Sequence, residues 1–317
     1  MIRQGVSRLL LAVSLAATAS VWTAAASAQA ERRPLYDGPA PGSEAWTQPR
    51  VEVVRNGDVS VYNTSQPVYE LHVPRPERAS GAAVVMLPGG GLRALACGAS
   101  MQAEVDALVA EGVAVLVLEY RTLQLSPDEL QRMTAPSPPP TPGPGAVPPR
   151  FPRMTIVNGN ANPAAGDARL DEVLRLATKD AQAALRLLHA NSTEWHIDPA
   201  RIGVMGTSAG GGVAFATLLD RASPAEQRPD FLVSLYGPSL QDVIVWQGAP
   251  PLFMAVEAEH GAVTDGLIEV FRIWTSAYQS AELHIFAVPN FSMTERLWGP
   301  RLFDWMRGQG LLPAEDR

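Results

Sequence analysis

A serine lies between two glycines in the stretch Gly206-Thr207-Ser208-Ala209-Gly210. The apolar run Ile202 to Met205 precedes it and is typical of a buried strand, and the residues after it suit a helix. Such a strand-to-helix turn holds a serine in a strained conformation and projects its hydroxyl beyond the edge of the sheet. The pattern therefore predicts that Ser208 is a nucleophile. A structural Gly-Ser turn is the alternative, because so short a pattern also arises by chance.

A second glycine-rich stretch supports the nucleophile interpretation. The apolar run Ala82 to Leu87 ends in Pro88-Gly89-Gly90-Gly91, a loop whose backbone N–H groups could point at a developing oxyanion. The backbone N–H of Ala209 would be the second donor. We therefore expect an oxyanion hole built from Gly89, Gly90, Gly91 and Ala209.

The elements around these motifs predict an α/β domain with a mostly parallel central sheet and helices on both faces. Nearly continuous apolar runs, as expected of parallel strands covered on both faces, are Ala82–Leu87, Ala114–Leu118, Ile202–Met205, Phe231–Leu235, Leu252–Val256 and Leu283–Phe286. The clearest helix is Asp171–Ala190, in which apolar residues recur at three- and four-residue spacing. Val51–Val73 alternates in part, which suits antiparallel strands flanking that sheet.

Two segments lie outside this regular alternation. Residues 31–50 are rich in Pro, Gly and charge, and we interpret them as an extended arm before a domain that spans 51–317. Residues 133–167 form a long insertion, whose Pro-rich core, 136–152, suits neither helix nor sheet. The insertion is either a flap over the site or a surface excursion.

The first thirty residues have the features of a secretory signal peptide. Arg3 and Arg8 precede an apolar run that ends at Ala28-Gln29-Ala30, an A-x-A cleavage pattern. A membrane anchor is the alternative, but the apolar run is short and diluted by Ala, Ser and Thr. We expect cleavage before Glu31, no stable membrane anchor afterwards, and a periplasmic or extracellular protein.

Composition excludes several other classes of function. The net charge of −7 disfavours nucleic acid and anionic membranes as partners. Cys97 is the only cysteine, so no disulfide framework is possible within the chain, and we expect it to be a packed residue rather than a nucleophile. The sequence contains no metal-ligand cluster, P-loop or dinucleotide fingerprint, so we expect no cofactor and no metal.

Several of these motifs occur together in a known family. The chain resembles the bacterial acetyl-xylan-esterase-like and acetylhydrolase branch of the α/β-hydrolase fold from about Val68 to Leu312. The resemblance is carried by Pro88-Gly89-Gly90-Gly91, Leu118-Glu119-Tyr120-Arg121, Asp180-Ala181-Gln182-Ala183-Ala184, Asp198-Pro199-Ala200-Arg201-Ile202, Ser208-Ala209-Gly210-Gly211 and Phe303-Asp304-Trp305. It implies a Ser, Asp, His triad and removal of acetyl or similar acyl groups from sugars and small esters.

The chain departs from the family at two of the three triad positions. Ser208 matches the nucleophile, but His260 stands where the family has its acid, and Asn290 stands in the turn where the family has its histidine. A serine hydroxyl is a weak nucleophile until a base takes its proton, and an asparagine cannot do so. The triad of this chain is therefore degenerate with respect to the family.

His260 is the best candidate for a replacement base. His72, His189, His196 and His284 lie within or before strands and helices, whereas a hydrolase site lies beyond the carboxyl ends of the strands. His260 follows such an end, in the loop 257–264 that in the family reaches the triad. Candidate acids to orient its imidazole are Glu257, Glu259, Asp265 and Asp242. Either Ser208 and His260 form a working dyad, or the site has lost its base.

Two functions follow from these alternatives. As an enzyme, the protein would be an exported serine-type carboxylic ester hydrolase that removes a short acyl group from a sugar or small ester through an acyl-Ser208 intermediate. As a non-catalytic relative, it would keep the pocket and bind a carbohydrate or an acyl ligand. An intact elbow and glycine loop favour the enzyme, and the lost acid and base favour the binder.

Overall fold

A twisted eight-stranded sheet is the centre of the molecule in the computed structural model, which describes residues 31–135, 154–289 and 292–314. Its strand order is β1-β4-β7-β5-β8-β9-β10-β11. The six strands from β7 to β11 are parallel, and β4 pairs antiparallel with β7 and with β1. These strands are β1 (Arg33–Pro34), β4 (Val68–His72), β5 (Ala83–Leu87), β7 (Ala114–Glu119), β8 (Ile202–Thr207), β9 (Leu232–Leu235), β10 (Leu252–Glu257) and β11 (Ala281–Phe286).

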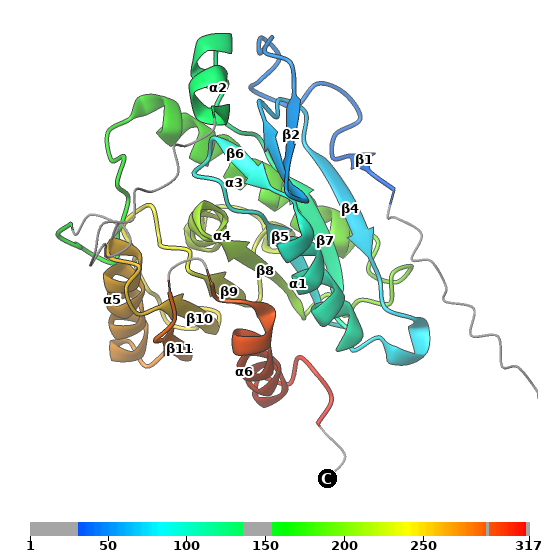
Figure 1. Ribbon diagram of the computed structural model, residues 1–317. Coiled ribbons are helices and arrows are strands. Elements are labelled where there is room, and N and C mark those ends of the chain that lie inside the picture. The colour runs from blue at the N-terminus through cyan, green and yellow to red at the C-terminus, as the bar shows by residue number, and fades with distance from the viewer. Residues whose placement is uncertain (1–30, 136–153, 290–291, 315–317) are drawn as a thin grey trace, which may run out of the picture.

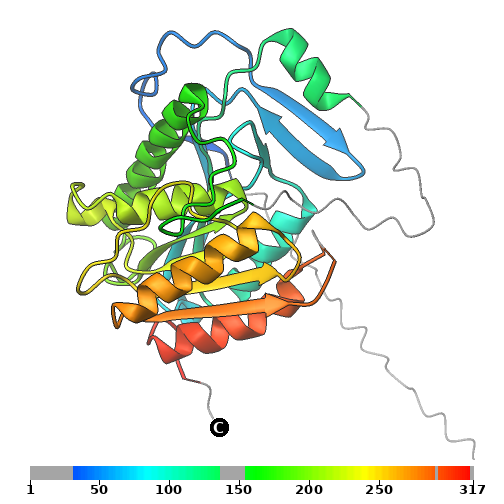
Figure 2. The ribbon, with the colours of Figure 1, turned by 90° about the vertical axis from the view of Figure 1, so that its left-hand side faces the viewer.

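Helices cover both faces of the sheet (Figure 1, Figure 2). The helices α1 and α6 pack on one face, and α3, α4 and α5 pack on the other, with α2 above. Their bounds are α1 (Ala99–Ala110), α2 (Pro127–Thr134), α3 (Ala168–Ala190), α4 (Ala209–Leu219), α5 (Ala262–Ser276) and α6 (Glu295–Gly308), with short 3₁₀ turns at Pro76–Arg78 and Ala225–Gln227. Within the described residues, no helix is long and apolar enough to cross a membrane.

Alternation along the buried strands explains the two layers of core. In β5, Val85 and Leu87 belong to the core under α3, α4 and α5, and Val84 and Met86 belong to the core under α1 and α6. Successive side chains of a strand point to opposite faces, so a strand covered on both faces must be apolar throughout. The expected parallel strands and the helix beginning near Asp171 are confirmed, with ends shifted by a few residues.

The early strands are only partly where the alternation placed them. β4 flanks the parallel strands as expected, but β2 (Val51–Arg55) and β3 (Asp58–Tyr62) form a separate sheet with β6 (Ala94–Ala96). The pairing of β3 with β6 brings the chain that follows the glycine loop back beside the N-terminal region. Partial alternation indicated strands, but it could not show with which other strands they would pair.

The arm of residues 31–50 lies against the domain. β1 pairs with β4, and the Tyr36 hydroxyl donates to Asp180 at 2.8 Å. Asp180 is fully buried and accepts two hydrogen bonds from the Arg121 guanidinium, which also donates to the Pro41 carbonyl at 2.6 Å. A buried ion pair thus connects the arm to the centre of the domain.

The described end of the insertion packs tightly beside the loop after β9. The Ala161 N–H donates to Ser239 O at 2.9 Å, and the Val243 N–H donates to Asn158 O at 2.8 Å. The Asn158 and Asn160 side chains both donate to Asp242 at 3.0 Å. This part of the insertion is therefore a fixed wall of the domain, whereas its Pro-rich core falls outside the described residues.

Candidate active site

Ser208 occupies the strained turn that the sequence predicts. It joins β8 to α4 with φ 50° and ψ −125°, a left-handed conformation that non-glycine residues rarely adopt. The chain crosses itself closely here: a Cβ on Gly206 would lie 2.3 Å from Gly210 O, and a Cβ on Gly210 would lie 2.0 Å from Leu87 O. Both glycines are needed because larger residues would collide with backbone atoms.

The glycine loop lies against this turn. A Cβ on Gly89 would come within 3.0 Å of Ser208 Cβ, so the loop and the serine are in direct contact. Gly90, Gly91 and Leu92 follow with φ of 137°, 65° and 59°, which turns the chain sharply beside Ser208. Ala209 is the first residue of α4, and the first N–H groups of a helix have no partner within it.

His260 is held by Glu257, one of its four candidate acids. The distance from His260 Nδ1 to Glu257 Oε2 is 2.8 Å, and the two residues are 2% and 0% exposed. Burial acts to raise the pKa of Glu257, but the hydrogen bond from His260 and other contacts outweigh it and lower the pKa overall. Glu257 is thus a carboxylate that favours a proton on Nδ1, which leaves Nε2 as the basic nitrogen.

The other candidate acids are placed differently. Asp242 accepts hydrogen bonds from Asn158 and Asn160, so its expected role as an orienting acid is wrong. It holds the wall of the insertion through these contacts. Glu259 is exposed, and Asp265 lies in the first turn of α5. Their expected role as orienting acids stays a prediction.

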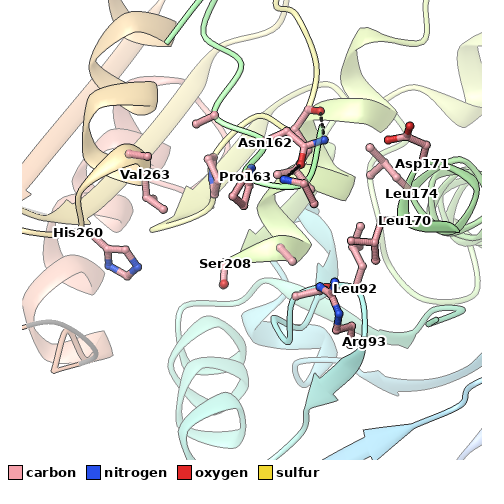
Figure 3. A pocket seen from close by; sticks show the side chains of 17 residues that line it. Leu92, Arg93, Asn162, Pro163, Leu170, Asp171, Leu174, Ser208, His260 and Val263 are labelled. Atoms are coloured by element: carbon pink, nitrogen blue, oxygen red, sulfur yellow. Dashed lines mark hydrogen bonds between the residues drawn. The ribbon is translucent and has the colours of Figure 1, made fainter. Parts of the chain in front are cut away.

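Ser208 and His260 line the same cavity, of about 220 Å³ (Figure 3). Its walls come from the glycine loop, the start of α3, the loop after β9, the start of α5 and the described end of the insertion. They are mainly apolar, with Arg93, Asn162 and Asp171 as polar groups. The lining residues are Gly91, Leu92, Arg93, Ala161, Asn162, Pro163, Ala164, Leu170, Asp171, Leu174, Ser208, Ala209, Pro238, Leu240, His260, Ala262 and Val263.

Within the described residues, no hydrogen bond joins the Ser208 hydroxyl to the His260 imidazole. Figure 3 shows the two side chains on neighbouring parts of the cavity wall, Ser208 from the elbow and His260 from the loop after β10. Hydrogen bonds between a nucleophile and its base are often long without a substrate and tighten in the reacting complex. The arrangement therefore suits a base near the serine that is not yet engaged with it.

The remaining histidines lie outside the lining of this cavity. His72 is in β4, His189 is in α3, His196 is in the turn before β8, and His284 is in β11 with Nε2 2.6 Å from Glu282. Asn290 lies outside the described residues, so its expected place on the same sheet edge as His260 stays a prediction. Among the described residues, no group of His, Cys, Asp or Glu is arranged to hold a metal ion.

Sequence reasoning missed two parts of this site. Asn162 and Pro163 form a wall of the cavity, although their stretch has no catalytic pattern. Tyr236 stacks on His260, with ring centroids 6.0 Å apart and planes 10° from parallel. A signal for Tyr236 was present, because it directly follows β9 and the carboxyl ends of parallel strands meet at one sheet edge.

Comparisons with known proteins agree with this architecture. Residues 172–294 match a family profile described as alpha/beta hydrolase fold. A comparison with curated proteins found no match. The structure is similar to that of an acetyl ester-xyloside bifunctional hydrolase from Caldicellulosiruptor lactoaceticus, with a TM-score of 0.55 and 17% identity over 90% of this chain and 98% of that chain.

Two further structures are similar over most of their length. A lipase/esterase from Lactobacillus plantarum has a TM-score of 0.53 and 14% identity over 84% of this chain and 99% of that chain. An esterase from Thermogutta terrifontis has a TM-score of 0.51 and 13% identity over 80% of this chain and 91% of that chain. At these identities the similarity defines the fold, and the protein has the α/β-hydrolase fold.

Proposed function

We propose that the protein is an exported serine-type carboxylic ester hydrolase that acts on short acyl esters of sugars or other small alcohols. The observation that carries this proposal is the hydrogen bond between the buried pair His260 and Glu257, in a cavity that also contains Ser208. Histidine and glutamate are residue types that serve as a base and its orienting acid, and the serine of the elbow is a residue type that serves as a nucleophile.

The proposed reaction proceeds through an acyl-enzyme. Nε2 of His260 takes the Ser208 hydroxyl proton while Oγ attacks the ester carbonyl. Backbone N–H groups of the glycine loop, Gly89 to Gly91, and of Ala209 stabilise the negative oxygen of the tetrahedral intermediate, and Glu257 stabilises the imidazolium. The imidazolium then donates its proton to the leaving alcohol. Water, deprotonated by the same imidazole, attacks acyl-Ser208 and releases the acid and the free serine.

The acid and base of this site differ in position from those of the family it resembles. His260 occupies the family's acid position and Glu257 lies at the end of the preceding strand, β10. Both groups thus come from one loop, on the side of Ser208 where the family has only its acid. We propose that the dyad of Ser208 and His260, supported by Glu257, replaces the family's triad.

Cavity size and lining support a short acyl group and a polar alcohol. A volume of about 220 Å³ is below the range of sites for drug-sized ligands, and Leu170, Leu174 and Leu240 make much of its wall apolar. Arg93, Asn162 and Asp171 offer hydrogen bonds to sugar hydroxyls. One similar structure is titled an acetyl ester-xyloside bifunctional hydrolase, which supports an acetylated sugar as the substrate class here.

A direct test combines an active-site label with hydrolysis of an activated acetate ester. We expect a fluorophosphonate probe to label Ser208 in the wild type, and Ser208→Ala and His260→Gln each to lower kcat/KM by about 10³-fold or more. The double variant should be no worse than either single one, because the two residues act as a unit.

A matched control and two contrary results complete the test. His284→Gln disrupts a second His–Glu pair outside the cavity lining and should keep full activity. Loss of turnover in Ser208→Ala without loss in His260→Gln would exclude the dyad. Absence of any Ser208-dependent labelling or turnover would favour the alternative, a catalytically impaired relative that binds a carbohydrate or acyl ligand.

A further inference from the structure

Tyr236 contacts the proposed base on a side that Glu257 does not reach. Its ring is nearly parallel to the His260 imidazole, at 10° with 6.0 Å between centroids. Glu257 contacts the imidazole edge through Nδ1. A hydrogen bond at Nδ1 restrains the direction of the imidazole, and an aromatic neighbour against the face restrains its plane.

The backbone of Tyr236 is tied to both halves of the site. Its N–H donates to Ala255 O at 2.7 Å, in the strand that leads to His260. The preceding carbonyl, Leu235 O, accepts from the Ser208 N–H at 3.1 Å. Tyr236 thus lies on the connection between the elbow and the histidine loop, and a shift of either would move it.

Tyr236 also has a costly backbone conformation. Its φ is 40°, in the left-handed region, where a bulky side chain is strained. Such conformations persist where surrounding structure imposes them and cluster at functional sites. Burial raises the pKa of the Tyr236 phenol, and the Glu104 and Glu257 carboxylates raise it further, so the ring beside His260 stays neutral.

We infer that Tyr236 is a positioning residue for His260, and that it holds the plane of the imidazole while Glu257 holds its direction. This inference rests on the proposed function. Tyr236 acts on the alignment of His260 Nε2 with the Ser208 hydroxyl. For this role the aromatic ring of Tyr236 matters more than its phenol hydroxyl. The role predicts a change in kcat with little change in KM, because no contact with the substrate is required.

The test compares two substitutions at this position. Tyr236→Phe keeps the ring and should retain kcat within about threefold. Tyr236→Leu keeps apolar bulk without the ring and should lower kcat by about 10- to 100-fold with KM nearly unchanged, since small misplacements of a reacting group have effects of this size. The pH profile of kcat should also change in Tyr236→Leu and match that of the wild type in Tyr236→Phe.

Tyr278→Leu is a matched control. Tyr278 is another aromatic residue with left-handed φ, at 58°, but it is 95% exposed and absent from the cavity lining. Its substitution should leave kcat and the pH profile unchanged. Thermal unfolding of every variant separates loss of alignment from loss of fold, which matters because Tyr236 also packs against both cores.

NMR of the full chain gives a readout that does not need turnover. The His260 ring resonances, assigned by their loss in His260→Gln, should change in chemical shift in Tyr236→Leu and remain near their wild-type values in Tyr236→Phe. If both variants leave the resonances and the pH profile unchanged, the inference is wrong, whatever the activity. A wild type without Ser208-dependent turnover would instead overturn the proposed function while the NMR comparison still decides the positioning role.

Discussion

The pair of Glu257 and His260 is the arrangement on which the proposed chemistry depends. They are three positions apart in the sequence, and a turn after β10 folds the imidazole back onto the carboxylate. A buried carboxylate is costly unless it is hydrogen bonded, and His260 meets that need. The same contact that stabilises the loop thus also selects the imidazole nitrogen that could act as base.

A substitution at Glu257 tests this dual role. Glu257→Gln keeps an acceptor of similar shape but removes the charge that stabilises the imidazolium. We expect kcat to fall by about 10²- to 10⁴-fold, as for loss of the acid in other serine hydrolases. Steady-state hydrolysis of an activated acetate measures this, with Glu282→Gln at the other His–Glu pair as the control. Equal activity in Glu257→Gln and wild type would exclude Glu257 as the orienting acid.

The direction of the Glu257 pKa shift also predicts how acid affects the stability of the fold. Because the pKa is lowered from 4.5, the folded protein binds fewer protons than the unfolded chain near that pH. The contribution of the Glu257 charge to stability is therefore present above pH 4.5 and is lost as the pH falls through the lower folded value. At neutral pH the residue stays charged, and pH dependence of activity there belongs to other groups.

Each group of the proposed site is positioned by the end of a different strand. The elbow follows β8, the glycine loop follows β5, Tyr236 follows β9, and His260 follows β10. These strands are neighbours in the order β5-β8-β9-β10 and run parallel, so their carboxyl ends lie side by side. The described end of the insertion then closes the cavity, held there by Asp242.

Helix α1 carries a buried carboxyl group that gives the fold a measurable pH dependence. Burial, with a further contribution from Glu295, raises the pKa of Glu104 from 4.5 to about 8. Between these values the folded protein binds more protons than the unfolded chain, so stability falls as the pH rises from about 5 to about 8.

Glu104→Gln should remove this fall. Between pH 5 and pH 8, the free energy of unfolding of the variant should rise by about 2–4 kcal/mol relative to that of the wild type. This range follows from about 1.36 kcal/mol per pKa unit. Urea unfolding at the two pH values measures the difference. Asp106→Asn, at an exposed position of the same helix, should show no such gain. A parallel pH dependence in wild type and Glu104→Gln would show that Glu104 is already charged at neutral pH.

On the scale of the molecule, the arm and the domain form one folded unit. The buried pair of Arg121 and Asp180 joins Pro41 and Tyr36 to the centre of the fold. The arm thus begins to contact the domain within a few residues of the expected cleavage site before Glu31. A mature chain that starts there would keep every described contact of the arm.

Export predicts a defined mature N-terminus. N-terminal sequencing of the exported protein should begin at Glu31, since the small residues Ala28 and Ala30 suit the A-x-A pattern. Ala30→Phe, which replaces a small residue with a large one, should slow cleavage and leave a longer chain. Retention of Met1 in exported wild-type protein would contradict the signal-peptide prediction and favour the alternative, a membrane anchor.

Local parts of this protein could be predicted from residue type and spacing. Apolar runs predicted the parallel strands, because strands covered on both faces must be apolar at every position. Gly206, Ser208 and Gly210 predicted the elbow, because only small residues tolerate that close crossing of the chain. The loop after β10 was predicted to bring His260 to the cavity, since strand direction decides which edge a loop occupies.

Which side chains meet depends on the packing of distant segments and could not be predicted in this way. Glu257 and Asp242 were equal candidates in the sequence, and their contacts separate them, one with His260 and the other with Asn158 and Asn160. The pairing of β2 and β3 with β6, the wall at Asn162 and the stacking of Tyr236 also depend on contacts between distant segments. Residue type and spacing encode local conformation, whereas such contacts arise from the packing of the whole chain.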